Sequence, residues 1–207
     1  MRGRFITLEG GEGAGKSTQA THLAERLRAA GHAVLQTREP GGAPGAEILR
    51  HLLLSGEVEW SLLAETLLHF AARAEHVERV IRPALEAGTW VVCDRFYDST
   101  MVYQGLAQSG DLGGIAALSA MMDLRPDLTL ILDVDVPTAL ARLRARGTAA
   151  DRYERLGASF FARVREGFLA VASVEPDRCV VVPAGGGTEE VAAALWSVVR
   201  RRFSLDG

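Results

Sequence analysis

The sequence predicts an α/β fold in which a five-stranded parallel sheet is flanked by helices. The first observation is a set of five short, mostly apolar runs bounded by turn residues: Phe5–Glu9, Ala33–Arg38, Trp90–Asp94, Leu128–Val134 and Cys179–Pro183. Strands that are apolar almost throughout are typical of a parallel sheet covered on both faces. The second observation is that helical patterns alternate with these runs. The third is a glycine-rich turn directly after the first run, at the sheet edge where such folds bind ligands.

Helical segments are predicted from the apolar periodicity between the runs. They lie at Lys16–Ala30, Ala139–Arg146, Ser159–Val174 and Glu189–Phe203. Gly31 and Gly88 each follow a helical pattern at a position suited to a C-terminal cap. Thr188 is predicted as the N-cap of the last helix. Because no repeat, low-complexity tract or linker interrupts the alternation, residues 1–207 are interpreted as one domain.

Composition argues against several classes of function. The net charge is −3 at pH 7, so no overall basic field favours nucleic acid. The chain shows neither a signal-peptide pattern nor an apolar stretch long enough to span a bilayer, so no membrane partner is expected. Cys93 and Cys179 lie in apolar runs and are predicted to be buried free thiols, which are typical of a reducing compartment. The predicted location is therefore the cytoplasm.

The turn after the first strand carries the pattern Gly10-x-x-x-x-Gly15-Lys16-Ser17, which is typical of a phosphate-binding loop. Its glycines let backbone N–H groups approach phosphate oxygens at the positive end of the next helix. Lys16 would meet the β- and γ-phosphates of ATP, and the Ser17 hydroxyl would bind Mg²⁺. The predicted ATP-binding residues of this segment are Gly10, Gly11, Glu12, Gly13, Ala14, Gly15, Lys16, Ser17 and Thr18. The alternative is a glycine-rich turn that binds nothing.

Charged side chains follow two further strands at the same predicted edge of the sheet. The second strand ends in Arg38-Glu39-Pro40, and the third ends in Asp94-Arg95. Asp94, after an apolar strand, is placed like the acidic Mg²⁺ partner of phosphoryl-transfer enzymes. Arg95 is suited to bidentate phosphate binding. Surface ion pairs are the alternative for each group taken singly.

A second basic cluster begins at Arg142 and ends near Glu154. It joins two helical patterns through a short loop, so residues 142–154 are interpreted as a lid that brings arginines onto transferring phosphates. A solvated helix face is the other interpretation, and the residues leave both open.

Four motifs resemble those of the thymidylate kinase family, and the similarity runs from Phe5 to about Phe203. They are the segments Glu9-Gly10-Gly11-Glu12-Gly13-Ala14-Gly15-Lys16-Ser17-Thr18, Arg38-Glu39-Pro40-Gly41-Gly42, Asp94-Arg95-Phe96-Tyr97-Asp98-Ser99-Thr100-Met101-Val102-Tyr103-Gln104 and Arg125-Pro126-Asp127-Leu128-Thr129. The resemblance implies a P-loop NTPase fold and transfer of the ATP γ-phosphoryl group to dTMP, giving dTDP, with Mg²⁺. It also implies a homodimer and a role in dTTP synthesis.

The same resemblance implies a dTMP pocket. Its residues would be Glu12, Glu39, Pro40, Arg50, His69, Phe70, Arg73, Arg95, Ser99, Thr100, Tyr103 and Gln104. Within it, Arg95 would grip the phosphate, and Tyr103 would press on the sugar where a 2′-hydroxyl would sit. Arg50 and Arg73 would reach thymine. The implied metal residues are Ser17 and Asp94.

The resemblance further implies which arginines act in catalysis. The position at which some family members carry an arginine in the phosphate loop is Gly13 here, so the chain resembles the bacterial type with lid arginines. The implied catalytic residues are Lys16, Arg95, Arg146 and Arg152. Arg142 would instead pack along adenine.

Two positions depart from the family pattern. The family usually has a phenylalanine four residues before Arg73, whereas this chain has His69, with Phe70 next. Both rings lie at helical spacings from Arg73, so which of them stacks on thymine stays open. After the last strand, Pro183-Ala184 replaces the family's usual acid-alanine pair near adenine.

The sequence leaves two alternative functions. One is a kinase for another nucleoside monophosphate, such as UMP, CMP or AMP. The other is a nucleotide-binding switch or regulatory ATPase, although a switch needs no second phosphate pocket. The acceptor motifs after strands two and three therefore favour a kinase.

Overall fold

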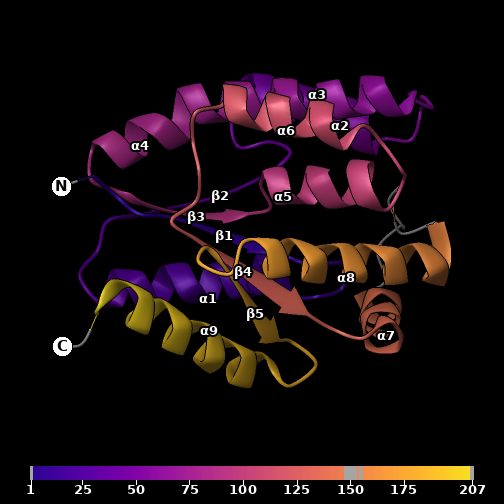
Figure 1. The fold of residues 1–207 in the computed structure, drawn as a ribbon. Helices are drawn as coiled ribbons and strands as arrows, with labels where there is room; N and C mark the ends of the chain where they lie inside the picture. Colours follow the sequence, from indigo (N-terminus) through magenta and orange to yellow (C-terminus); the bar gives the residue numbers. More distant parts are fainter. Residues whose placement is uncertain (1, 147–152, 154–155, 206–207) are drawn as a thin grey trace.

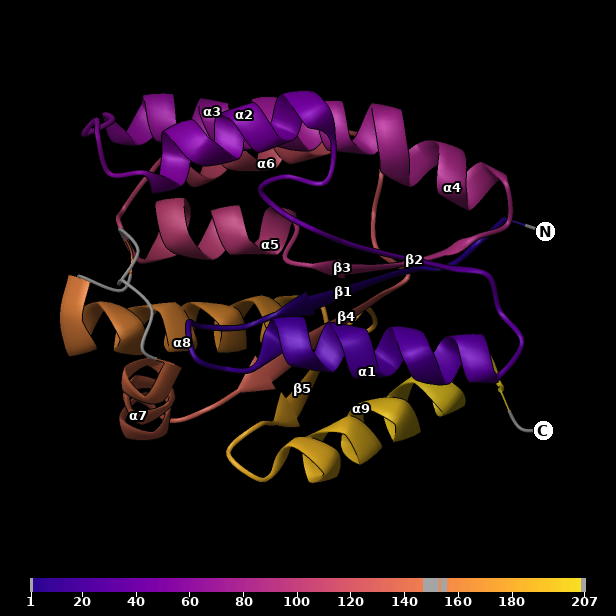
Figure 2. The same ribbon diagram turned by 180° about the vertical axis from the view of Figure 1, so that it is seen from behind.

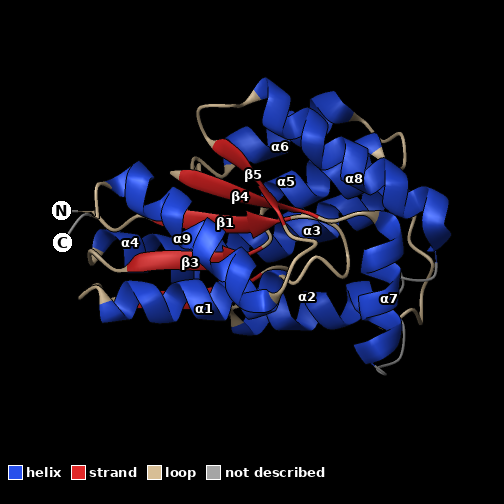
Figure 3. Ribbon diagram, turned by 90° about the horizontal axis from the view of Figure 1, so that it is seen from below, coloured by secondary structure: helices blue, strands red, loops and turns tan. Residues whose placement is uncertain are grey.

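The computed structural model describes residues 2–146, 153 and 156–205. Within these residues, five strands form one sheet in the order β2-β3-β1-β4-β5. Their bounds are β1 Phe5–Glu9, β2 Val34–Arg38, β3 Trp90–Asp94, β4 Leu128–Asp133 and β5 Cys179–Pro183. Every neighbouring pair is parallel, and the strands lie side by side in Figure 3. The predicted parallel sheet is confirmed, and its strand bounds differ by at most one residue at either end.

Helices cover both faces of this sheet (Figures 1 and 2). On one face lie α1 (Lys16–Ala29) and α9 (Thr188–Phe203). The other face is covered by α4 (Arg82–Glu86), α5 (Tyr97–Thr100) and α8 (Gly157–Val174). An outer layer consists of α2 (Pro44–Leu54), α3 (Leu62–His76) and α6 (Leu112–Met121), and α7 is Val136–Arg146. Two π-helical segments, Val77–Ile81 and Met101–Leu106, continue α3 into α4 and extend α5.

Strand alternation divides the apolar core between the two faces. Ile6 and Leu8 pack with buried residues of α1 and α9. The side chain of Phe5 points to the opposite face and packs there with Ile81 and Leu85. This two-sided burial explains why the strands are apolar almost throughout. Among the described residues, no helix is long and apolar enough to cross a membrane.

Three predicted helix starts differ from the structure, those of α7, α8 and α9. Helix α8 begins at Gly157, two residues before the predicted Ser159. The N-cap of α9 is Gly187, and Thr188 is already the first helical residue. Helix α7 begins at Val136, three residues before the predicted start. Asp135 stabilises this start, because its carboxylate accepts hydrogen bonds from Thr138 N (2.8 Å) and Thr138 Oγ1 (2.9 Å). Pro137 is tolerated there because the first helical turn needs no donor at that position.

Candidate active site

A cavity of about 530 Å³ lies at the carboxyl ends of β1, β2 and β3. Most predicted site residues line it: Glu12, Gly13, Gly15, Lys16, Ser17, Thr18, Glu39, Pro40, Arg50, His69, Arg73, Asp94, Arg95, Ser99, Thr100, Tyr103, Gln104 and Arg142. Gly10, Gly11, Ala14 and Phe70 are not among its lining residues. The parallel strands thus bring together side chains from four distant segments of the chain.

The loop between β1 and α1 holds Lys16 against its own backbone. Lys16 is buried, and its Nζ donates to Gly10 O (3.1 Å) and Gly11 O (2.8 Å). Burial and the nearby Arg95 cation lower the pKa of this amine. Gly13 has φ 74°, and a Cβ there would lie 2.5 Å from Ala139 O, so the loop excludes a side chain at this position. The ammonium can exchange its carbonyl partners for phosphate oxygens.

Ser17 and Asp94 join the loop after β1 to the end of β3. Ser17 Oγ donates to Asp94 Oδ2 at 2.5 Å. The other carboxylate oxygen, Asp94 Oδ1, is buried and has no hydrogen-bond partner in the described part of the chain. A hydroxyl beside a carboxylate oxygen fits Mg²⁺, which takes few protein ligands and is completed by phosphates and water. Accordingly, the described residues contain no group of three His, Cys, Asp or Glu side chains able to hold a metal alone.

Arg95 follows directly on the end of β3, with φ 73°, and its N donates to Leu8 O at 2.9 Å. Its guanidinium donates to Gly10 O (3.2 Å) and forms an ion pair with Glu12. The guanidinium lies over the Tyr103 ring, 5.1 Å from its centroid. Although burial opposes the charge, Glu12 raises the pKa of Arg95 well above its ordinary value. Arg95 is therefore a permanent cation in the cavity.

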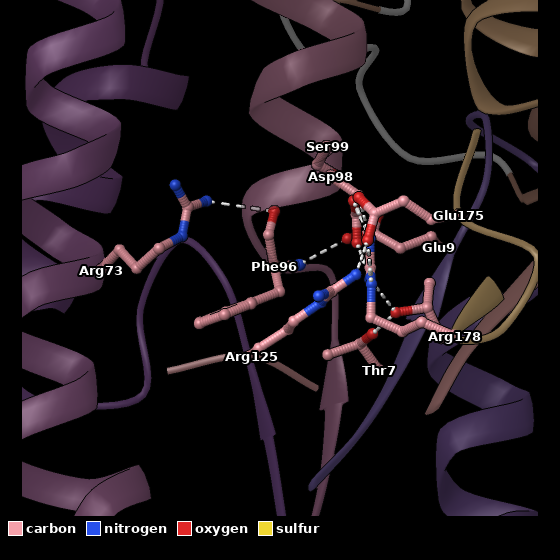
Figure 4. A network of polar contacts seen from close by, with 10 residues as sticks. Thr7, Glu9, Arg73, Phe96, Asp98, Ser99, Arg125, Glu175 and Arg178 are labelled. Carbon is pink, nitrogen blue, oxygen red and sulfur yellow. Dashed lines mark hydrogen bonds and ion pairs between the residues drawn. The ribbon is translucent and has the colours of Figure 1, made fainter. Parts of the chain in front are cut away.

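Glu9 holds the segment after β3 by hydrogen bonds, although the sequence did not identify it as a site residue. The carboxylate is fully buried and accepts hydrogen bonds from Phe96 N (2.7 Å) and Ser99 Oγ (2.6 Å) (Figure 4). Burial, and after it the Asp98 carboxylate, raise the pKa of Glu9 from 4.5 to about 8. The available signal was an acid at the end of an apolar strand, the same signal that identified Asp94.

A second buried contact anchors the other side of the turn. Arg178 donates to both carboxylate oxygens of Asp98, at 2.7 and 2.9 Å (Figure 4). Glu175 accepts from the same guanidinium at 3.0 Å. The segment after Arg95 is thus held by partners from β1 and from the residues after α8. Neither partner is near it in sequence.

Arg73 lies at the inner end of the cavity and is almost fully buried. Its Nε donates to Glu39 Oε2 (2.7 Å), and its Nη2 donates to Thr100 Oγ1 (3.1 Å). Its Nη1 is buried without a hydrogen-bond partner in the described residues. Phe70 is buried beneath the guanidinium, 4.8 Å from it, whereas His69 lines the cavity. Of the two rings left open by the sequence, the structure exposes His69 to the cavity.

Arg50, which is expected to reach thymine, lines the cavity and is held by the segment after β2. Arg50 Nη1 donates to Pro40 O at 2.6 Å. Burial and then the charge of Arg38 lower the pKa of Arg50, while Asp94 and Arg95 also interact with its charge. Arg50 therefore lies with the charged groups of the cavity. Its helical position alone could not reveal this, because the relevant charges come from β2 and β3.

Tyr153, which lines the cavity, and the buried Glu65 behind it were not predicted as site residues. Glu65 Oε1 accepts hydrogen bonds from Gln104 Nε2 and from the Tyr153 hydroxyl, each at 2.7 Å. His69 Nε2 lies 3.1 Å from the same hydroxyl. No motif in the sequence marks Glu65, which lies within an ordinary amphipathic helix.

Arg142 on α7 contacts the loop after β5. Its guanidinium donates to Ala184 O (2.8 Å) and Gly186 O (3.0 Å). The predicted neighbours in the lid cannot be placed in the same way. The side chain of Arg146, and Arg152 altogether, lie outside the described residues, as does most of the 142–154 segment.

Comparisons with known proteins agree on one family. A family model described as thymidylate kinase matches residues 8–195. The chain is 53% identical over 210 residues to a thymidylate kinase of Gluconobacter oxydans, covering 100% of this chain and 98% of that protein. It is 52% identical over 207 residues to one of Caulobacter vibrioides, covering 99% of each. The crystal structure of a thymidylate kinase from Ehrlichia chaffeensis aligns with a TM-score of 0.78 at 35% identity, covering 96% of this chain and 99% of that one.

Proposed function

The chain belongs to the thymidylate kinase family and phosphorylates dTMP, with ATP as the phosphoryl donor, and from this premise we propose how the cavity performs the reaction. One observation carries the proposal. Lys16 Nζ and Arg95 Nη1 both donate to the same oxygen, Gly10 O, at 3.1 and 3.2 Å. Two buried cations, one from the ATP-binding loop and one from the acceptor side, therefore converge on one point. Lys16 binds the ATP phosphates there, and Arg95 binds the phosphate of dTMP.

The acceptor side gains a second cation from Arg50. Its guanidinium is electrostatically coupled to Arg38 and Arg95, so the free protein concentrates positive charge where a dianion binds. In the free protein, Arg95 forms an ion pair with Glu12. The phosphate of dTMP either displaces Glu12 from Arg95 or binds the same guanidinium beside it. The attacking oxygen of dTMP is already anionic, so the transfer depends on positioning and charge neutralisation rather than on a strong base.

Ser17 and Asp94 are proposed to hold Mg²⁺ through the hydroxyl and the unpartnered Oδ1. When bound there, Mg²⁺ would neutralise negative charge on the ATP phosphates during transfer. The negative charge of Glu12 is paired with Arg95 and therefore offsets part of the positive charge near the metal site. The catalytic roles expected for Arg146 and Arg152 remain predictions, because those side chains lie outside the described residues.

The nucleoside of dTMP is proposed to lie between Tyr103 and the inner end of the cavity. The buried Arg73 Nη1 lacks a partner, which suits it to a carbonyl oxygen of the base. His69 flanks the base, and Thr100 with Gln104 completes this end of the cavity. Glu39 and Pro40 form its wall, with Glu39 held by Arg73.

Two alanine variants separate the donor and acceptor roles in a coupled assay. Lys16→Ala is expected to lower kcat at least about a thousandfold, and Arg95→Ala to raise the KM for dTMP at least about a hundredfold. Arg79→Ala, at an exposed arginine on the surface, is the control. Turnover within tenfold of wild type in both variants, about 1.4 kcal/mol, would contradict the proposal.

We also propose a homodimer formed through the outer layer of helices. Apolar side chains lie exposed at helical spacing there: Ile48 and Leu52 on α2, and Leu63 and Leu67 on α3. Ile48 and Leu63 are each 67% exposed, although they are large and apolar. The two helices are adjacent in Figures 1 and 2, and each of them exposes two of these apolar residues. We propose that a second copy of the chain buries these apolar side chains.

Light scattering coupled to size exclusion tests the assembly. Wild type is expected at twice the 22.2 kDa chain mass, and Leu63→Glu at or near the chain mass. Val174→Glu, at an apolar residue exposed on α8, is the matched control and should stay dimeric. A wild-type monomer at micromolar concentration would contradict the homodimer.

Two further expectations remain proposals. The chain is proposed to act as one nucleoside monophosphate kinase domain, supported by relatives that match it over almost their whole length. A cytoplasmic location is supported by Cys93 and Cys179, which are buried free thiols of the kind found in reducing compartments.

A further inference from the structure

A closed polar network lies behind the part of the cavity assigned to the base. Glu65 on α3 is fully buried, and Gln104 is 1% exposed. Gln104 Nε2 donates to Glu65 Oε1 at 2.7 Å and to the Tyr153 hydroxyl at 2.9 Å. The Tyr153 hydroxyl donates its proton to Glu65 Oε1 at 2.7 Å. Both amide hydrogens of Gln104 are therefore used within the protein.

This network determines which way the Gln104 amide faces. A carboxylate oxygen only accepts hydrogen bonds, so Glu65 requires the amide nitrogen, not the amide oxygen, on its side. Rotating the amide by 180° would bring Gln104 Oε1 against Glu65 Oε1 at hydrogen-bond distance, an arrangement without a proton between two acceptors. Tyr153 reinforces the choice, because its only proton is already donated to Glu65 and its oxygen must accept from Gln104. Gln104 Oε1 accepts no hydrogen bond within the described residues.

The same reasoning assigns the tautomer of His69. Its Nε2 lies 3.1 Å from the Tyr153 hydroxyl, whose proton is directed at Glu65. The hydroxyl oxygen is then the acceptor, and His69 Nε2 carries the hydrogen. The ring that lines the cavity is therefore oriented by the same carboxylate that orients Gln104. Glu65 thus orients both Gln104 and, through Tyr153, His69.

We propose that Glu65 and Tyr153 are specificity-determining positioning residues, which hold Gln104 as a hydrogen-bond acceptor and so select a thymine or uracil edge over a cytosine edge. This inference rests on the proposed binding of the base in this cavity. The N3 position of thymine and uracil is a donor, whereas N3 of cytosine is an acceptor. A fixed amide oxygen of Gln104 accepts a hydrogen bond from N3 of thymine or uracil. With cytosine, the same oxygen would face N3, which is also an acceptor. Buried polar groups left unpaired in this way cause strong rejection of the wrong ligand.

The test measures equilibrium binding of dTMP, dUMP and dCMP to the full chain by calorimetry. In Glu65→Gln, the side chain at position 65 can donate or accept, so either orientation of Gln104 is satisfied. The ratio of the Kd values for dCMP and dTMP is expected to fall at least about tenfold, and further in Glu65→Gln with Tyr153→Phe. The ratio for dUMP and dTMP should stay unchanged, because these two bases share the same edge. Glu75→Gln, on the same helix but partly exposed, is the matched control.

Three outcomes are decisive. Equal weakening of all three ligands would show a merely structural role and overturn the inference, as would a dCMP ratio within twofold of wild type in both variants. If Glu65→Gln fails to fold, Gln104→Ala should still lower the ratio, because the fixed acceptor is removed, and an unchanged ratio there overturns the inference. Binding of dTMP to Gln104→Ala distinguishes a failure of this inference from a failure of the proposed base-binding site. If that variant binds dTMP as tightly as wild type, the base lies elsewhere and the proposed binding site itself is wrong.

Discussion

Ser17 Oγ and Asp94 Oδ2 are joined by a 2.5 Å hydrogen bond, which links the first turn of α1 to the last residue of β3. The contact leaves Asp94 Oδ1 buried and without a protein partner among the described residues. Both residues line the cavity, so the hydroxyl and the carboxylate lie side by side there. This pair is the basis of the first prediction.

Asp94→Asn is expected to raise the Mg²⁺ concentration for half-maximal turnover at least about tenfold, because an amide binds Mg²⁺ more weakly than a carboxylate. Binding of dTMP without metal should be unchanged, since Asp94 does not contact the acceptor in the proposed arrangement. The measurement is a Mg²⁺ titration of the coupled assay. Asp177→Asn, at an exposed aspartate, is the control. An unaltered Mg²⁺ profile would exclude Asp94 from the metal site.

Tyr103 is expected to discriminate against ribose. The ring is buried, and its hydroxyl donates to Glu12 Oε1 at 3.1 Å, which holds the ring in place at the cavity wall. In Tyr103→Ala, the ratio of kcat/KM for dUMP to that for UMP should fall at least about tenfold, since space opens for a 2′-hydroxyl. Tyr103→Phe keeps the ring and should keep most of the ratio. The steric role is wrong if alanine leaves the ratio as in wild type.

Arg142→Ala is expected to raise the KM for ATP about tenfold with little change in kcat. The guanidinium holds the loop after β5 through Ala184 O and Gly186 O, so its loss frees the loop expected near adenine. Arg144→Ala, two residues away and exposed, is the matched control. Steady-state kinetics at saturating dTMP supplies both constants. A change confined to kcat would assign Arg142 to the chemical step instead.

Glu9 is expected to make the stability of the protein depend on pH. Its pKa is raised to about 8 by burial and by Asp98, with Arg95 and Ser99 acting in the opposite direction. The folded protein therefore binds more protons than the unfolded chain between about pH 4.5 and 8, and the contribution of Glu9 falls as pH rises through that window. The slope approaches about 1.4 kcal/mol per pH unit for one proton.

Urea unfolding of wild type and Glu9→Gln from pH 5 to pH 8 checks this sign. The free energy of unfolding of wild type should decrease relative to that of Glu9→Gln as pH rises. Glu57→Gln, at an exposed glutamate, should follow wild type. A difference between wild type and Glu9→Gln that is constant over the range would show that Glu9 does not titrate there.

Local sequence patterns suffice to predict the sheet, the phosphate loop and the family. The short apolar run that contains Phe5 and Ile6 indicates a strand, and the spacing of Gly10, Gly15 and Lys16 indicates a phosphate-binding loop. Both properties depend on neighbours along the chain. Asp94 and Arg95 could be identified as site residues because they end a strand at the ligand-binding edge. The Gly187 cap and the early start of α7 were missed because helix ends depend on single hydrogen bonds.

The side chains that act together can be identified only from the folded chain. Glu65 and Gln104 lie 39 residues apart, and Glu9 and Ser99 lie 90 apart, so no local pattern pairs them. The structure also placed Arg50 among charges from β2 and β3, and it put His69 rather than Phe70 at the cavity. The physical reason is that a buried polar group must find its partner wherever the fold brings one within hydrogen-bond distance. Sequence periodicity reports which side chains are buried, whereas the partners inside are chosen by packing of distant segments.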